Sequence, residues 1–155
     1  MSARLKGRVR AAARAAEEVA AWARTQPDVR GVALVGSHAR GRARLGSDVD
    51  LVVLTDAPEA RAADTTWFTG RVPRSRLIRA QAWGPLLERR FRLASGLHVE
   101  VGLVAPSWAA VPLDDGTRRV LAGGCRVLED PDGLLVAVVE AAAARPAAGG
   151  QPEAG

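Results

Sequence analysis

The chain is poor in several residue types: it has one cysteine, one lysine, two histidines and no tyrosine among 155 residues. A single cysteine, Cys125, excludes an internal disulfide, and with only two histidines we expect no Cys/His zinc site. No apolar run approaches the roughly 20 residues that a membrane-spanning helix needs. These absences predict a cytoplasmic protein with no membrane contact.

Positive charge is abundant and comes almost entirely from arginine. Lysine and arginine total 22 against 17 acidic residues, a formal net charge of +5. Guanidinium groups pair with phosphate, so anionic ligands are compatible with this excess. A codon bias towards alanine, arginine and glycine explains the excess as well, and no recognition motif accompanies it. We therefore expect no nucleic-acid partner.

The spacing of apolar residues predicts a single domain of mixed helices and strands over residues 1–144, followed by a disordered tail at 145–155. Residues 3–24 repeat apolar positions at spacings of three and four, and Pro27 lies just after that helix. The further helices are expected at 60–68, 115–122 and 134–144, and the strands at 29–35, 48–54, 77–83, 88–93, 97–104 and 125–128.

Two acidic residues mark the start of the second strand. Asp48 and Asp50 are separated by one residue, so in a strand they project to the same face while Val49, Leu51 and Val53 face the core. Two carboxylates side by side repel one another unless a hard divalent cation lies between them. The pair therefore predicts a metal site of the kind that phosphoryl and nucleotidyl transfer use.

A glycine-serine pair ends the preceding strand. Gly36 allows the backbone to approach a ligand closely, and Ser37 offers a hydroxyl to phosphate oxygens. If a helix begins within residues 38–42, its free N–H groups would also point at an anion. The loop is neither a phosphate-binding Walker sequence nor a dinucleotide-binding fingerprint, because the required glycine spacings are absent.

The order strand, Gly36-Ser37, loop, Asp48-Val49-Asp50 resembles the DNA polymerase beta-type nucleotidyltransferase superfamily, above all its small bacterial single-domain members. Residues 39–41 and 47–51 match as well. The resemblance implies an α+β nucleotidyltransferase fold with a mixed central sheet flanked by helices. It also implies a third carboxylate on a later strand, for which Glu100 is the candidate. Glu100 would act as a metal ligand or as general base; a solvent-facing position on an edge strand is the alternative.

The resemblance implies the following roles. Gly36 and Ser37 would hold a nucleoside triphosphate, and Asp48, Asp50 and Glu100 would bind two Mg²⁺ ions and form the catalytic set. Nucleotide binding is also expected of two loop residues, Arg40 and Ser47. For Arg40 a structural role remains open, and for Ser47 a turn or cap.

The expected activity is Mg²⁺-dependent transfer of a nucleoside monophosphate, AMP as the first choice, to a hydroxyl acceptor. The alternative is a non-catalytic or antitoxin-like module of the same fold that binds a protein partner. A homodimer or a hetero-complex remains open, since the chain leaves little room for an acceptor domain.

Two further expectations concern the arginines of the hairpin and the tryptophans. Arg89, Arg90 and Arg92 should form a solvated hairpin, and the four tryptophans, Trp22, Trp67, Trp83 and Trp108, should lie in the core.

Overall fold

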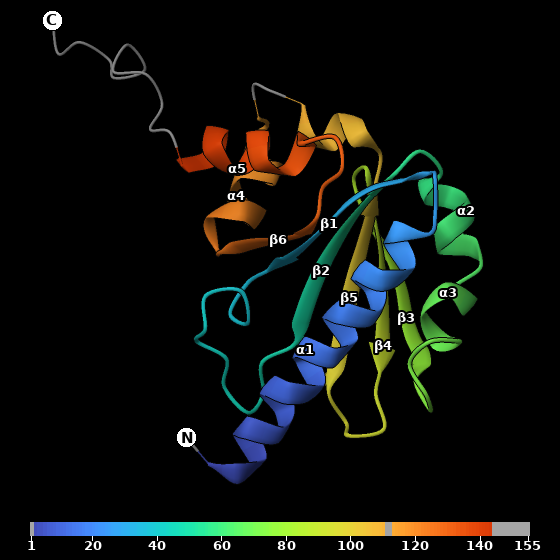
Figure 1. The fold of residues 1–155 in the computed structure, drawn as a ribbon, viewed down its shortest axis with the longest axis vertical. Helices are drawn as coiled ribbons and strands as arrows, with labels where there is room; N and C mark the ends of the chain where they lie inside the picture. The colour runs from blue at the N-terminus through green and yellow to red at the C-terminus, as the bar shows by residue number, and fades with distance from the viewer. Residues whose placement is uncertain (1, 111–112, 144–155) are drawn as a thin grey trace, which may run out of the picture.

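The protein has an α+β fold, as expected, built on one mixed sheet of six strands (Figure 1). The computed structural model describes residues 2–110 and 113–143. The strand order is β3-β4-β5-β2-β1-β6, and the β2–β5 pair is parallel while the other pairs are antiparallel. The expected tail at 145–155 lies outside the described residues, so it stays a prediction.

The element boundaries follow the sequence expectations closely. The strands are β1 (Val29–Val35), β2 (Val49–Thr55), β3 (Arg76–Trp83), β4 (Leu86–Arg92), β5 (His98–Val104) and β6 (Cys125–Glu129). The helices are α1 (Ala3–Arg24), α2 (Pro58–Ala63), α3 (Thr66–Thr69), α4 (Asp115–Ala122) and α5 (Leu134–Ala143), with a short 3₁₀ helix η1 (Pro106–Ala109). None of the helices in the described part of the chain is both long and apolar enough to cross a membrane.

Helix α1 forms because its sequence is rich in alanine and repeats a buried stripe every three to four residues. Ser2 caps its start, since the Ser2 hydroxyl accepts a hydrogen bond from the Leu5 N–H at 3.1 Å. The buried stripe, which includes Ala16, Val19 and Ala23, packs against the sheet. The predicted helix at residues 3–24 is therefore confirmed.

The predicted helix at 60–68 is interrupted. Asp64 accepts hydrogen bonds from both the Thr66 N–H, at 3.0 Å, and the Thr66 hydroxyl, at 2.7 Å. A side chain that binds the backbone two residues ahead competes with helix geometry. The segment consequently divides into α2 and α3, which end and begin on either side of Asp64.

Helices cover both faces of the sheet and enclose two apolar clusters. On the α1, α2 and α3 side, Trp22 stacks on Trp67 with ring centroids 4.5 Å apart, and Phe68 stacks on Phe91 at 4.0 Å. On the side of η1, α4 and α5, the cluster includes Trp108, Leu121 and Leu135. The expectation of four core tryptophans is wrong for Trp83, which is 57% exposed on β3.

Strand β2 contributes to both clusters by alternation. Val49, Leu51 and Val53 are fully buried or nearly so on the α1 side, and Val52 and Leu54 are buried on the α4–α5 side. Asp50 shares the second face, because residues two apart in a strand point the same way. Asp50 therefore lies on the α4–α5 side of the sheet.

Candidate active site

The two carboxylates at the start of β2 meet a third one from β5. Asp50 and Glu100 are direct partners in the parallel β2–β5 ladder, so their side chains share one face of the sheet. Asp48 precedes β2 by one residue and is half-buried. The structure thus brings the three sequence-predicted acids to one edge.

Gly36 lies against this carboxylate set. Its φ of +81° is a left-handed conformation that glycine adopts without strain. A Cβ atom at this position would lie 2.9 Å from the Asp50 Oδ2 atom, closer than real Cβ contacts allow. The Gly36 N–H donates to the Gly124 carbonyl at 3.2 Å, which ties the turn to the start of β6. A side chain at residue 36 would therefore force the Asp50 carboxylate to shift.

The loop after Gly36 forms consecutive turns rather than the start of a helix. The Arg40 N–H donates to the Gly36 carbonyl at 3.2 Å, and the Arg42 N–H to the Ser37 carbonyl at 2.9 Å. Within the described part of the chain, the backbone N–H groups of residues 37–39 donate to no other protein group. Free backbone N–H donors of this kind can hold an anion.

The remaining loop candidates have mainly structural contacts. Arg40 is exposed, and its stem lies against Gly124, where a Cβ would overlap it. The Ser47 hydroxyl accepts a hydrogen bond from the Arg44 N–H at 2.8 Å and closes the turn that leads into β2. These contacts support a structural role for Arg40 and a turn-forming role for Ser47, the alternatives to nucleotide binding.

An arginine from β4 enters the site, which the sequence analysis did not anticipate. Arg90 Nη2 donates to Asp48 Oδ2 at 3.2 Å and forms an ion pair with Glu100 Oε1. Arg90 Nε is buried and has no hydrogen-bond partner among the described residues. The expected solvated hairpin is thus wrong for Arg90. The signal available was the i, i+2 spacing of Glu88 and Arg90, which places both charges on one face of a strand.

Glu88 is a fourth acid that sequence reasoning missed. It is 8% exposed, and its two oxygens are held from β3: Arg79 Nη2 donates to Oε1 at 2.6 Å and Trp83 Nε1 to Oε2 at 3.0 Å. Arg79 Nη2 also lies 3.4 Å from Glu100 Oε1. Strand β3 therefore fixes one wall of the carboxylate cluster.

Burial and neighbouring negative charge both favour the protonated form of Asp50. Burial, followed by the charge of Asp48, raises the pKa of the Asp50 carboxyl to about 6; Glu88 adds to the rise, whereas Arg90 and His38 oppose it. Four carboxylates face only two guanidinium groups, those of Arg79 and Arg90. A further cation would relieve this imbalance.

Three of the four carboxylates, those of Asp50, Glu88 and Glu100, line a cavity of about 290 Å³. Gly36, Asp50, Glu88 and Glu100 form its polar end. Apolar groups, including Leu86 and Val120, line the rest. The arrangement can hold a charged group at one end and a flat or apolar group at the other.

Comparison with known proteins assigns the chain to a family. The sequence profile of the nucleotidyltransferase domain matches residues 17–106, which include Gly36, Asp48, Asp50 and Glu100. The chain belongs to this family. The match confirms the resemblance inferred from the sequence, and it supports nucleotidyl transfer as the general class of activity for this domain.

Among solved structures, the nucleotidyltransferase domain is similar to a poly(U) polymerase, with a TM-score of 0.44 and 16% sequence identity. The alignment covers 66% of this chain and 31% of the polymerase chain, so the domain spans about a third of that relative's length. No curated protein matches the sequence significantly.

The family implies divalent cations, and the carboxylates gathered at this edge of the nucleotidyltransferase domain are of the right chemical type, although they are not arranged as a metal site. Carboxylate oxygens are the ligands that Mg²⁺ prefers. In the arrangement described, no group of three or more His, Cys, Asp or Glu side chains in residues 2–110 and 113–143 is gathered closely enough to hold a metal. The Arg90 guanidinium contacts both Asp48 and Glu100 and supplies positive charge at that point.

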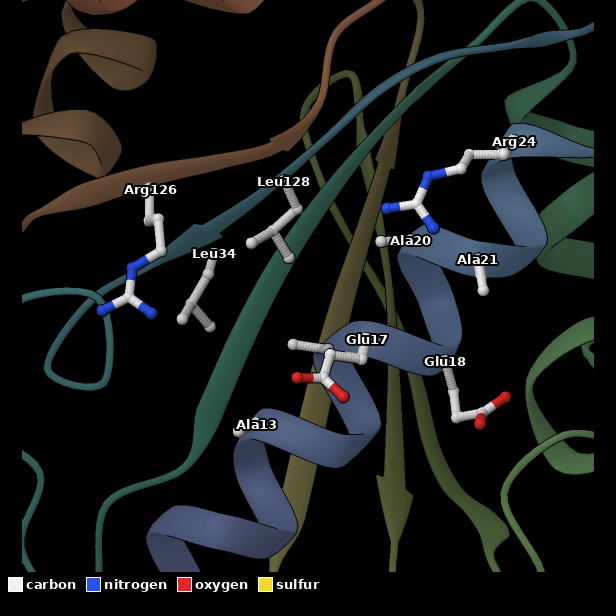
Figure 2. Close-up of a pocket in the computed structure, with 10 residues that line it drawn as sticks. Ala13, Glu17, Glu18, Ala20, Ala21, Arg24, Leu34, Arg126 and Leu128 are labelled. Atoms are coloured by element: carbon white, nitrogen blue, oxygen red, sulfur yellow. The ribbon is translucent and has the colours of Figure 1, made fainter.

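A second hollow of the nucleotidyltransferase domain lies on the opposite face of the sheet. It separates α1 from β1 and β6 and measures about 530 Å³. Figure 2 shows Glu17 of α1 approaching it from one side and Leu34 and Arg126 from the strands on the other. Leu34 belongs to the α1-side cluster, so this hollow is separate from the carboxylate edge.

Proposed function

We propose that this domain transfers a nucleoside monophosphate, with AMP as the first choice, from a nucleoside triphosphate to a hydroxyl acceptor, using two Mg²⁺ ions. The observation that supports this most directly is that Asp50 lies beside Glu100 on neighbouring strands while Gly36 lies against the same Asp50 carboxylate. The residues that we propose as cation ligands and the turn that we propose to hold phosphate thus meet at one edge of the sheet.

The triphosphate would lie along the turn that begins at Gly36. The free N–H groups of residues 37–39 support this placement, and the Ser37 hydroxyl is a further donor. Arg40, exposed at the rim, would add positive charge near the phosphates. Ser47 would contribute by holding the loop and would contact phosphate with its remaining hydroxyl proton.

Asp48, Asp50 and Glu100 would hold the cations. Bound Mg²⁺ would supply Lewis-acid stabilisation of the attacking and leaving oxygens. Arg90 would have to release Asp48 and Glu100 for this, and its guanidinium would then be available to pair with the triphosphate.

The reaction itself balances as a displacement at phosphorus. The acceptor hydroxyl oxygen forms a bond to the α-phosphorus, and the bond between that phosphorus and the oxygen bridging to the β-phosphate breaks. The electron pair of the broken bond leaves with pyrophosphate. The hydroxyl proton passes to a carboxylate, and Glu100 is the proposed base.

The test is a transfer assay with each of the four common ribonucleoside triphosphates labelled at the α-phosphate, Mg²⁺, and a desalted extract of the native host as the source of acceptors. Wild type should produce a labelled acceptor, and chelation of the metal or the Asp48→Ala/Asp50→Ala double variant should abolish it. The matched control is Asp56→Ala/Asp132→Ala, which removes two exposed carboxylates that pair with Arg30. No labelled product from wild type with any of the triphosphates would overturn the proposal.

One observation favours a second candidate, the non-catalytic module that binds a protein partner. Arg90 pairs with both Asp48 and Glu100 and so supplies the counter-charge that a cation would otherwise provide. A stable hetero-complex recovered from the native host, together with no transfer by the complex, would favour this module over the enzyme.

A further inference from the structure

Trp83 is the most exposed large hydrophobic side chain among the described residues, at 57%. The other three tryptophans, Trp22, Trp67 and Trp108, are at most 9% exposed. The ring of Trp83 is nevertheless held in place, because its Nε1–H donates to Glu88 Oε2 at 3.0 Å. A large aromatic surface that a hydrogen bond orients and that stays open to solvent is suited to contact a ligand.

Trp83 flanks the carboxylate cavity. Its direct partner in the β3–β4 ladder is Leu86 and its hydrogen-bond partner is Glu88, and both of these residues line the cavity. Directly paired residues project to the same face of a sheet, and so do residues two apart on one strand. Because Arg90 is the direct partner of Glu100, these rules place Trp83 on the face that carries the carboxylates.

The rest of the cavity, beyond its carboxylates, is apolar. Leu86 leans across β5 onto Gly102, where an added Cβ would lie 2.9 Å from Leu86 Cδ1. Val120 of α4 lines the cavity as well. Among the described residues that line this cavity, only the three carboxylates carry polar side-chain groups. A neutral, flat group therefore fits the region beside Trp83 better than a phosphate does.

We propose that Trp83 stacks on the base of the nucleoside triphosphate, with Glu88 fixing the orientation of the indole ring. This inference rests on the proposed function. The proposed triphosphate turn follows β1 and the proposed cation ligands lie at β2 and β5, so the strand order places Trp83 on the side of the carboxylates away from the phosphates. Two strand spacings, about 10 Å, separate β5 from β3. The ribose and base of one nucleotide can bridge this gap.

Stacking on Trp83 predicts how the site distinguishes bases. Every base has an aromatic face, so stacking alone tolerates all four. A purine covers more of the indole than a pyrimidine does and removes more apolar surface from water. Among the described residues, the cavity lining has no side-chain amide or hydroxyl to read the edge of a base. ATP and GTP should therefore bind more tightly than CTP and UTP, which is compatible with AMP as the first choice for transfer.

The first experiment compares calorimetric binding of ATP and of inorganic tripolyphosphate, both with Mg²⁺, to the full chain. Trp83→Leu should weaken ATP binding by about fivefold to a hundredfold and leave tripolyphosphate binding unchanged, because only ATP has a base. Trp83→Phe keeps an aromatic ring and should retain most of the affinity for ATP. The matched control is Leu77→Ala, which alters an exposed residue of β3 whose direct partner is Phe91 of the α1-side cluster. It should bind both ligands as wild type does.

The outcomes of this experiment separate the inference from the proposed function. Unchanged ATP binding in Trp83→Leu would overturn the inference and leave the proposed function standing. An equal loss of ATP and tripolyphosphate binding would also overturn it, because Trp83 would then act only through the position of Glu88. If wild type binds neither ligand, the proposed function itself fails and the inference fails with it.

The second experiment uses the fluorescence of Trp83. The other three tryptophans are buried, so the emission typical of an exposed indole comes from this residue. With excitation outside the adenine absorption band, ATP should quench this emission and tripolyphosphate should not. Trp83→Phe should bind ATP without that quenching. Equal quenching by tripolyphosphate, or quenching that requires the acceptor extract and not ATP, would overturn the inference; the second result would assign the ring to the acceptor.

Discussion

Arg90 and Glu100 are direct partners in the β4–β5 ladder, and the Arg90 guanidinium links Glu100 to Asp48 across the end of β2. The side chain of Arg90 is 22% exposed, and its Nε atom is buried without a partner in the described residues. This half-buried guanidinium pairs with two of the carboxylates that we propose as cation ligands. A cation bound as we propose would therefore have to compete with Arg90 for Asp48 and Glu100.

The first prediction is that Arg90→Ala increases the affinity for Mn²⁺ in the absence of nucleotide. Removal of the guanidinium leaves Asp48 and Glu100 without a counter-ion, so the affinity should rise by about tenfold or more, which corresponds to the roughly 1.5–3 kcal/mol of a charged hydrogen bond. Isothermal titration calorimetry measures the change. Arg92→Ala, an exposed arginine two residues along β4, is the control and should bind Mn²⁺ as wild type does. An Arg90→Ala variant with unchanged or weaker affinity would contradict the competition.

The second prediction is that Asp50→Asn stabilises the metal-free protein. The pKa of Asp50 is raised from 3.8 to about 6, so the folded state binds this proton more tightly than the unfolded state does. Wild type therefore loses stability as the pH rises from about 4 through 6, and the variant does not. The difference in free energy of unfolding should be near zero at about pH 4 and reach about 1–2 kcal/mol above pH 6. Urea unfolding at several pH values checks this, and a wild type more stable than Asp50→Asn at neutral pH would refute it.

The third prediction separates backbone strain from the contact at Gly36. Gly36→Ala places a methyl group 2.9 Å from Asp50 Oδ2 and forces alanine into a φ of +81°, so both the fold and nucleotide binding should suffer. Gly41→Ala has a similar φ, +69°, but open space around it. Each variant should lose about 1–2 kcal/mol of stability from strain. Only Gly36→Ala should also lose binding of a fluorescent nucleoside triphosphate analogue; loss of binding in both would show that strain alone explains the effect.

The fourth prediction concerns an ion pair remote from the site. Arg61 and a hydrogen bond from Thr55 lower the pKa of Asp28 from 3.8 to about 2. This pair contributes stability above about pH 4 and loses it as the pH falls through 2. Asp28→Asn should cost about 1 kcal/mol at neutral pH, after allowance for partial exposure, and the cost should vanish in strong acid. Asp56→Asn, which breaks an exposed pair with Arg30, should cost less than about 0.5 kcal/mol by the same thermal or urea measurement.

The sequence predicted most of the fold because its patterns are local. The spacing of apolar residues sets α1, and alternation about Asp48 and Asp50 sets the faces of β2. The interruption at Asp64 was not expected, because it depends on the hydrogen bonds that the Asp64 carboxylate makes to Thr66. The turn after Gly36, in place of a helix start, likewise depends on a long-range contact with Gly124.

Part of the site could also be predicted from local patterns in the sequence. Glu100 could be selected because an acid in an apolar strand requires an explanation, and it lies beside Asp50. The i, i+2 spacing of Glu88 and Arg90 places both on one face of β4, but whether that face meets Glu100 depends on the register of β4 against β5, which the sequence does not determine. Trp83 was assigned to the core on its residue type, whereas its position on an edge strand leaves the ring in solvent.

The central claim is that the edge formed by Gly36, Asp48, Asp50 and Glu100 is a site for a metal–triphosphate complex. Calorimetric titration of the full chain with ATP, in the presence of Mg²⁺ and after its removal by chelation, tests this most directly. We predict saturable binding that requires Mg²⁺ in wild type and in Asp56→Ala/Asp132→Ala, and no binding in Asp48→Ala/Asp50→Ala. Binding that is unaffected by either Mg²⁺ removal or the Asp48→Ala/Asp50→Ala change, or no binding by wild type, would contradict the account.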